Sequence, residues 1–111
     1  MIGTSSIFSD AAIFHFLSYS KNIEMIEYLN NKPMRFNELS LKLSATKENP
    51  NPQVPNRAFS GSIRKARQFH LIKHTDESIS GALNKRLPYM LTWKGMKAYE
   101  IIQSIRTKLN D

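Results

Sequence analysis

The amino-acid sequence predicts a single, mainly helical α+β domain over residues 1–111, and three observations support this prediction. The 111 residues are enough for one hydrophobic core but too few for two, and 41% of them are hydrophobic. Most of the chain carries apolar residues at helical spacing, whereas residues 71–92 contain two strand-like runs around turn-forming residues. The chain has no cysteine, so it contains neither disulfides nor thiolate metal sites.

Residues 7–20 form the first expected helix, which carries apolar groups around most of its circumference. Phe8, Phe14, Phe16 and Leu17 point in different directions, so this helix must be covered on more than one side. Either the core of the same domain or a second subunit can supply the cover. Polar residues interrupt the run, and it is shorter than the roughly 20 apolar residues that cross a membrane. We therefore expect a soluble, cytoplasmic protein with no membrane segment.

Residues 23–31 form the second expected helix. Ile23, Ile26 and Leu29 recur at helical spacing on one side of it, and the two glutamates between them face water. Two consecutive asparagines end the run, because asparagine favours turns over helix interiors.

A short extended piece is expected at residues 34–36, followed by a third helix over residues 38–43. Asn37 is a suitable N-cap for that helix, because its side-chain oxygen can accept a hydrogen bond from a free backbone N–H. Residues 44–56 then contain three prolines, each of which disfavours helix at the residue before it. We therefore expect an extended, proline-rich loop that connects two helices of one domain.

Residues 57–69 form the fourth expected helix, with Asn56 as its N-cap. One side of this helix is expected to face the core, through Phe59, Ile63, Ala66 and His70. The opposite side is basic or small and carries Arg57, Gly61, Arg64, Lys65 and Gln68, with Ser60 at the margin. No acid occurs between residues 49 and 75. This is unusual, because exposed helices commonly gain stability from ion pairs between successive turns.

Two strands are expected within residues 71–92, one over residues 71–75 and one over residues 86–92. Turn-forming residues separate the two strands, which predicts a hairpin. Pro88 places the second strand at an edge of the sheet, because proline has no N–H to donate to a neighbouring strand. The tip of the hairpin carries two basic residues, Lys85 and Arg86.

A last helix is expected over residues 93–109. Its apolar stripe consists of Ala98, Ile101, Ile102, Ile105 and Leu109. Together with the first helix, it is the expected surface for pairing two subunits.

The net charge of +7 is concentrated in one part of the chain. Residues 1–48 and 100–111 are each neutral, whereas residues 49–99 hold nine basic side chains and two acidic ones. The basic residues are Arg57, Arg64, Lys65, Arg67, Lys73, Lys85, Arg86, Lys94 and Lys97. A localised cationic surface binds polyanions by releasing counterions from phosphates, so nucleic acid is the predicted partner.

The predicted order is two helices, a short extended piece, two more helices, a hairpin and a final helix. Most of the basic residues lie on the fourth helix and the hairpin. This is the order of a winged helix-turn-helix domain. In such domains one helix enters the major groove, and the hairpin, called the wing, touches the backbone or the minor groove.

Three motifs resemble those of HxlR-type transcription regulators. Residues 35–39 read Arg-Phe-Asn-Glu-Leu, as in that family. Residues 60–72 are similar to its Leu-Ser-x-x-Leu-x-x-Leu-x-x-x-Gly-Leu-Ile motif, and residues 88–95 resemble its Pro-x-x-Tyr-x-Leu-Thr-x-x-Gly motif. MarR-type and ArsR-type proteins share the last motif more loosely. The resemblance implies a dimeric transcription regulator with residues 57–69 as the recognition helix and residues 71–92 as the wing.

The chain departs from the family pattern at two places. The loop over residues 44–56 is longer than the turn of 3 or 4 residues in a tight helix-turn-helix. His70 stands where the family motif carries glycine. The two departures concern the angle at which the recognition helix is held and the way in which it ends.

The predicted function is sequence-specific binding of double-stranded DNA by a homodimer that pairs through its N- and C-terminal helices. Arginine can bind guanine through two hydrogen bonds, lysine and glutamine hold phosphates, and glycine lets the backbone approach. The expected contacts are Arg57, Ser60, Gly61, Arg64, Lys65 and Gln68 on the recognition helix, and Lys85 and Arg86 on the wing. A dimer would place its recognition helices about 34 Å apart.

No catalytic constellation is recognisable in the sequence. A phosphate-binding glycine loop, a nucleophile elbow and a pair of catalytic carboxylates are all missing. We therefore expect no enzymatic activity, no cofactor and no metal. Two alternatives to duplex binding stay open: a protein-docking module whose basic face meets an acidic partner in a transcription assembly, and an RNA-binding protein.

Overall fold

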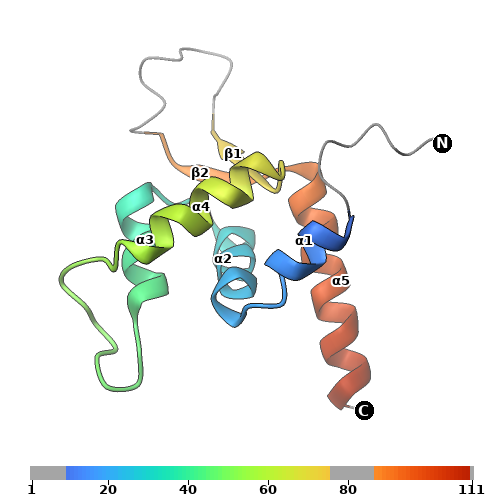
Figure 1. The fold of residues 1–111 in the computed structure, drawn as a ribbon, viewed down its shortest axis with the longest axis horizontal. Helices are drawn as coiled ribbons and strands as arrows, with labels where there is room; N and C mark the ends of the chain where they lie inside the picture. Colours follow the sequence, from blue (N-terminus) through green and yellow to red (C-terminus); the bar gives the residue numbers. More distant parts are fainter. Residues whose placement is uncertain (1–9, 76–86, 111) are drawn as a thin grey trace.

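The computed structural model describes residues 10–75 and 87–110, which form five helices and a two-stranded antiparallel sheet (Figure 1). The helices are α1 (Asp10–Phe16), α2 (Ser20–Asn31), α3 (Phe36–Ser44), α4 (Ala58–Gln68) and α5 (Trp93–Asn110). The strands are β1 (Ile72–His74) and β2 (Tyr89–Leu91). This confirms the predicted class, a mainly helical domain with a small antiparallel sheet.

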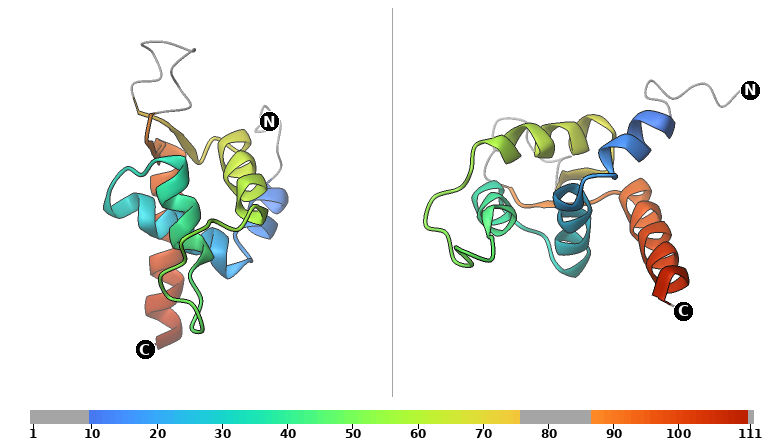
Figure 2. Two further views of the ribbon diagram at one scale, coloured as in Figure 1. Left: turned by 90° about the vertical axis from the view of Figure 1, so that its left-hand side faces the viewer. Right: turned by 60° about the horizontal axis from the view of Figure 1, so that its bottom comes forward.

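Helix α2 lies at the centre of the fold. It contacts α3, α5 and β2, and the ribbon views show it between α3 and α5 (Figure 1, Figure 2). Helix α4 lies across one end of this arrangement and contacts α3 and β1. The fully buried large apolar side chains are Met25, Ile26, Leu39, Leu43, Ile63, Leu71 and Ile72. One core therefore joins α2, α3, α4 and the start of the sheet.

The predicted first helix, residues 7–20, is interrupted in the structure, because α1 ends at Phe16 and a turn separates it from α2. Two side chains form hydrogen bonds with carbonyl groups at the end of α1. The Ser18 hydroxyl donates to the His15 carbonyl at 2.6 Å, and the Asn22 side-chain amide donates to the Phe16 carbonyl at 2.7 Å. The last carbonyls of a helix have no partner within it, so side chains that satisfy them favour a turn.

Helix α3 begins earlier than predicted. Asn37, the predicted N-cap, lies within the helix, and Arg35 holds the cap position without a side-chain hydrogen bond. The Met34 N–H donates to the Tyr89 carbonyl at 3.1 Å, and the Tyr89 N–H donates to the Met34 carbonyl at 2.7 Å. This bridge holds the chain extended up to Arg35, and the first helical bond, from the Leu39 N–H to the Arg35 carbonyl, follows directly at 2.9 Å.

Strands β1 and β2 form the predicted hairpin. Its paired residues are Ile72 and Leu91, Lys73 and Met90, and His74 and Tyr89. In this two-stranded sheet β2 is an edge strand, as predicted, and Tyr89 forms one isolated bridge with Met34 on its other side. Pro88 lies just before the strand, so its missing N–H interrupts no pairing. The predicted tip residues Lys85 and Arg86 lie outside the described residues.

The proline-rich loop is closed at its base by hydrogen bonds. The Asn56 N–H donates to the Ser44 hydroxyl oxygen at 2.7 Å, which joins the start of α4 to the end of α3. The Asn56 side-chain oxygen accepts a hydrogen bond from the Ala58 N–H at 2.9 Å, but Asn56 is not the N-cap that was predicted, because α4 begins at Ala58 and Arg57 holds the cap position without a side-chain hydrogen bond. These hydrogen bonds therefore fix the start of α4 next to the end of α3, although the loop between them is long.

Helix α4 ends in a left-handed turn at His70, whose φ angle is 63°. The N–H groups of His70 and Leu71 donate to the carbonyls of Arg67 and Ala66, both at 2.9 Å. This is the hydrogen-bond pattern of a Schellman C-cap, where glycine is favoured because it has no Cβ. The predicted burial of His70 is wrong, because the turn leaves His70 exposed and Phe69 buried.

The start of α5 is attached to the same turn. The Thr92 hydroxyl donates to the His70 carbonyl and accepts a hydrogen bond from the Gly95 N–H, so Thr92 caps α5. The Thr92 N–H donates to the Leu71 carbonyl at 3.0 Å. A Cβ on Gly95 would lie 2.0 Å from the Leu71 carbonyl oxygen, so only glycine fits there. These four residues form the Leu71 junction, which holds together α4, the sheet and α5.

We expect His70→Gly to stabilise the protein by about 1 kcal/mol, because an L-residue at positive φ has a steric cost that glycine avoids. Unfolding in urea measures the change as a higher midpoint with an unchanged slope. His70→Ala is the matched control, because it removes the imidazole but keeps a Cβ. Equal midpoints for the two variants would show that the left-handed turn does not limit stability.

Candidate nucleic-acid interface

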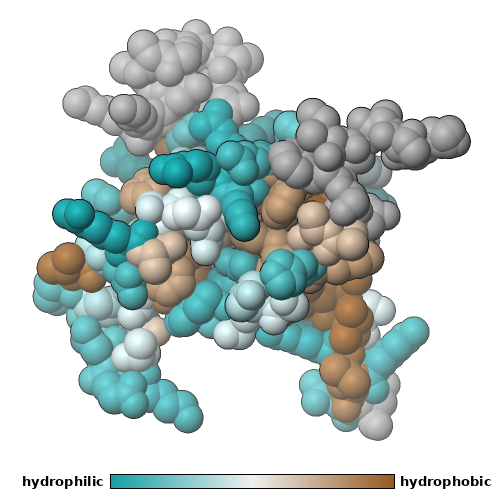
Figure 3. Space-filling view, viewed as in Figure 1, coloured by the Kyte–Doolittle hydropathy of each residue, from teal (hydrophilic) through white to brown (hydrophobic). Residues whose placement is uncertain are grey.

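The predicted contact residues of α4 lie on its exposed side. Arg57, Gly61, Arg64, Lys65 and Gln68 are exposed, and Ser60 is partly buried. Arg57 lies just before the helix, and each of the other residues lies three or four positions from at least one other member of the set, so they share one side of α4. Figure 3 shows hydrophilic side chains gathered over α4 on this face of the molecule. The structure therefore brings together all six residues predicted on this helix.

The opposite side of α4 fixes the direction in which these residues point. Ile63 and Ala66 are buried, as predicted, and Phe59 packs against the core with partial exposure. The ring of Phe69 meets that of Phe16 edge to face, with 5.5 Å between the ring centroids. Because α4 is anchored along its length, its basic side has one orientation relative to the rest of the fold.

Three basic residues at α4, Arg57, Arg64 and Lys65, are not paired with any acid among the described residues. The described carboxylates that form ion pairs are those of Glu24, Glu38 and Glu27, whose partners are Lys21, Lys32 and Arg106. Within the described chain, Arg57, Arg64 and Lys65 therefore make no ion pair with a carboxylate. Their charges are directed at solvent, where an external anion can reach them.

Ser60 has less freedom than the sequence indicates. Its hydroxyl donates to the Arg57 carbonyl at 2.8 Å, one turn back along the chain. The hydroxyl hydrogen is thus used within the protein, while the oxygen can still accept a hydrogen bond. Ser60 can therefore take a donor group from a partner more readily than it can donate to one.

Two exposed residues outside the predicted set lie on elements that are attached to the end of α4, namely β1 and the start of α5. Lys73 is the exposed middle residue of β1, the strand that contacts α4. Trp93 is 74% exposed at the start of α5, and the Lys97 ammonium lies 5.0 Å from the centre of its ring. The alternation of buried and exposed residues in β1 is a signal that could have identified Lys73. The exposure of Trp93 depends on the Leu71 junction and has no local signal.

A separate apolar groove runs between α1 and α5. Its volume is about 610 Å³, and its walls include Ile13, Phe14 and Leu17 from the N-terminal side. Of the predicted stripe of α5, Ala98 and Ile102 are buried, whereas Ile101, Ile105 and Leu109 are 53%, 53% and 79% exposed. Figure 3 shows hydrophobic side chains along α5 at the lower right of the view. This is a large unpartnered apolar surface for a small domain.

Residues 10–75 and 87–110 contain neither a cluster of metal ligands nor a membrane-spanning helix. No group of three or more His, Asp or Glu side chains in this part of the chain could hold a metal ion. No helix in it is both long enough and apolar enough to cross a membrane. Comparison of the chain with protein-family models, curated proteins and solved structures finds no match.

We expect Gly61→Ala to stabilise the protein by about 0.5–1 kcal/mol, because alanine is the better helix former and its Cβ would meet no atom within 4 Å. Gly95→Ala is the matched control. The same substitution there should destabilise the protein by about 1–3 kcal/mol, because the Cβ collides with the Leu71 carbonyl. Denaturant unfolding of both variants measures the effects, and a loss of stability in Gly61→Ala would contradict the exposed helical position of Gly61.

Proposed function

We propose that the protein is a winged helix-turn-helix transcription regulator that binds double-stranded DNA sequence-specifically and has no catalytic role. The observation that carries the proposal is the exposed side of α4, where Arg57, Arg64 and Lys65 make no ion pair with a described carboxylate. Such a surface gains binding free energy from phosphates through counterion release. Its place on a single helix suits the width of the major groove. The proposed site of action is the cytoplasm.

The order and contacts of the elements support the winged-helix part of the proposal. Helices α3 and α4 contact each other and are joined by the closed proline-rich loop. The two helices of a helix-turn-helix motif with an extended turn would be arranged in the same way. The hairpin of β1 and β2 follows α4 directly and contacts it. In this proposal α4 is the recognition helix and the hairpin is the wing.

In this proposal the residues along α4 have different roles. Arg57 and Arg64 supply guanidinium groups that can each bind guanine through two hydrogen bonds. Lys65 and Gln68 lie further toward the end of the helix and would hold phosphates, which fix the register without reading sequence. Gly61 lies between Arg57 and Arg64 in the chain, with open space above it, so the helix backbone can come close to the duplex.

A second copy of this chain is the proposed occupant of the apolar groove between α1 and α5. Phe14, Ile101, Ile105 and Leu109 are each more than half exposed, and covering them would bury apolar area from both subunits. Pairing two copies about a two-fold axis would present two recognition helices to successive major grooves, about 34 Å apart. The preferred DNA site would then be a pseudo-palindrome.

We expect the chain to select a pseudo-palindromic duplex from a random DNA pool. The logarithm of its affinity for that duplex should fall with the logarithm of salt concentration with a slope of roughly −7 to −9. A dimer with four or five phosphate contacts per subunit makes about eight to ten contacts, and each releases about 0.9 of a counterion. Electrophoretic mobility shift at several salt concentrations measures the slope. Stronger binding to an RNA competitor, or a slope near zero, would contradict duplex recognition.

Two variants test the assignment to α4. Arg64→Ala should weaken binding to the selected duplex by about 1–3 kcal/mol and relax preference at one base position. Lys108→Ala is the control, because it removes one exposed positive charge near the end of α5, away from α4. Equal losses in the two variants would indicate attraction by net charge alone.

The dimer has its own test. We expect Ile105→Glu to turn a dimer into a monomer, because a carboxylate in the centre of an apolar interface has to be desolvated without a partner. Met96→Glu is the matched control, because Met96 is exposed on the same helix and does not line the groove. Analytical ultracentrifugation measures the mass, and a monomeric wild-type chain at high protein concentration would overturn the proposed pairing.

A further inference from the structure

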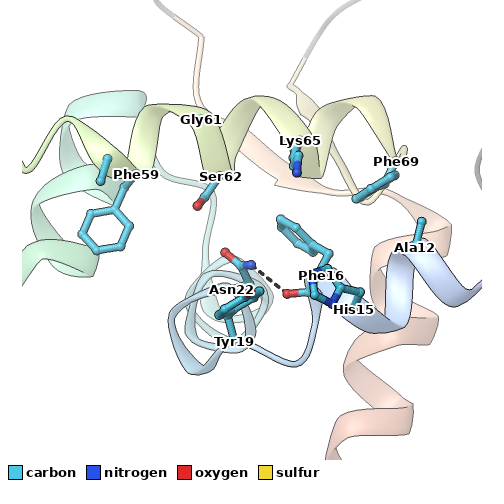
Figure 4. A pocket seen from close by; sticks show the side chains of 11 residues that line it. Ala12, His15, Phe16, Tyr19, Asn22, Phe59, Gly61, Ser62, Lys65 and Phe69 are labelled. Atoms are coloured by element: carbon cyan, nitrogen blue, oxygen red, sulfur yellow. Dashed lines mark hydrogen bonds between the residues drawn. The ribbon is translucent and has the colours of Figure 1, made fainter.

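A second groove lies beside α4, on the flank that faces α1 and the start of α2 (Figure 4). Its volume is about 610 Å³, which is within the range of small-molecule sites. Ser62 and Lys65 line it from α4, while Phe16 and Asn22 line it from the opposite side. The proposed contact with DNA leaves the interior of this groove without a role.

Aromatic rings form much of the surface of the groove. Phe16 and Phe69 meet edge to face near one end, and Phe59 stands at the other end (Figure 4). The ring of Tyr19 is at the rim, where the residue is 57% exposed. Aromatic rings gain dispersion and hydrophobic contact from other flat rings. These walls favour a planar aromatic ligand.

Asn22 supplies an unused hydrogen-bond acceptor. The residue is only 7% exposed, and its side-chain N–H donates to the Phe16 carbonyl at 2.7 Å. This bond fixes the orientation of the amide, because a carbonyl can only accept. The amide oxygen accepts no hydrogen bond from any described residue, and Figure 4 shows it directed across the groove toward Ser62. This oxygen presents a fixed hydrogen-bond acceptor to the groove, which a ligand N–H or O–H group can use.

The groove is also positively charged. Lys65 lies on its α4 side and makes no ion pair within the described chain. No Asp or Glu is among the lining residues, whereas the Ser62 hydroxyl can add a donor next to Lys65. A carboxylate is therefore better matched to this side of the groove than a cation.

From these features we infer that the groove binds an aromatic carboxylate that carries a ring N–H or O–H group. The carboxylate would lie against the Lys65 ammonium and the Ser62 hydroxyl. The ring would lie among Phe16, Phe59 and Phe69, and its N–H or O–H would donate to the Asn22 side-chain oxygen. Each group of the ligand thus interacts with one feature of the groove.

The site is coupled to DNA binding by shared residues, and this part of the inference rests on the proposed function. Gly61 and Lys65 line the groove and also belong to the side of α4 proposed to meet the duplex. A ligand that pairs with Lys65 and lies beside Gly61 removes one phosphate contact and obstructs close approach of the backbone. Occupancy should therefore weaken DNA binding, which makes the ligand an effector.

The probe for the site is indole-3-carboxylate, which combines a planar ring, a carboxylate and one N–H donor. Isothermal titration calorimetry of the full chain without DNA compares it with 1-methylindole-3-carboxylate, which lacks the donor, and with indole, which lacks the carboxylate. We expect the methylated probe to bind about fivefold more weakly, because one hydrogen bond is lost. Equal binding of these two carboxylates, or no binding of indole-3-carboxylate at millimolar concentration, overturns the proposed site.

A pair of lysine variants tests the carboxylate contact. Lys65→Met keeps an unbranched side chain and removes the charge, and it should weaken indole-3-carboxylate about three- to fivefold, as expected for an exposed ion pair. Binding of uncharged indole should not change. Lys47→Met is the control, because this exposed lysine of the proline-rich loop does not line the groove. Equal weakening by both variants means attraction by net charge and overturns the site.

Adding the duplex separates this inference from the proposed function. A fall in duplex affinity with indole-3-carboxylate, absent in Lys65→Met, supports the coupling. Ligand binding with unchanged duplex affinity overturns the coupling and leaves the groove as a binding site. If the chain binds the ligand and no duplex, the proposed function fails while the groove stands.

Discussion

The fold depends on the close approach of α5 to the Leu71 carbonyl. Because Gly95 has no Cβ, the first turn of α5 can pack against this carbonyl, and the Thr92 N–H donates to it at 3.0 Å. The Thr92 hydroxyl holds the preceding residue, His70, through its carbonyl. One junction thus fixes the end of α4, the start of β1 and the start of α5. The basic side of α4 and the apolar side of α5 consequently keep a fixed relation, as two subunits on one duplex would require.

The periodicity of the sequence was sufficient to predict the helices and the hairpin, because each has a local signal in the spacing of apolar residues. The errors arose where distant residues decide the local structure. The break after Phe16 depends on Asn22, and the start of α3 depends on pairing between Met34 and Tyr89. His70 follows the helical spacing of the core-facing residues, but the Schellman turn reverses the backbone just before it would enter the core.

The exposed side of α4 and the groove beside α4 differ in how far they could be predicted from the sequence. The exposed side of α4 lies within one helix, so the spacing of its residues was enough to predict it. In the structure the predicted contact residues of α4 lie on the same side of the helix. The groove beside α4 brings Asn22 opposite Ser62, and these residues come from different helices, so no local pattern links them. Asparagine at position 22 is unremarkable in the sequence. Its place in the groove becomes visible only in the structure, where the side-chain N–H is held by the Phe16 carbonyl and the side-chain oxygen is directed across the groove.

Two features of α4 lower its stability and lie on the same side. Arg57 places a positive charge at the positive end of the helix dipole, and no acid occupies the first turn. Gly61 weakens the helix interior, although nothing in the fold excludes a Cβ there. Stability alone would favour an acidic residue at position 57 and alanine at position 61. In the proposed complex, a phosphate at this end of α4 would neutralise the Arg57 charge and interact favourably with the helix N-terminus, while the open space at Gly61 would let the duplex approach. Both residues thus cost stability in the free protein and fit the proposed contact with DNA, whereas a helix that served only as support would gain from replacing them.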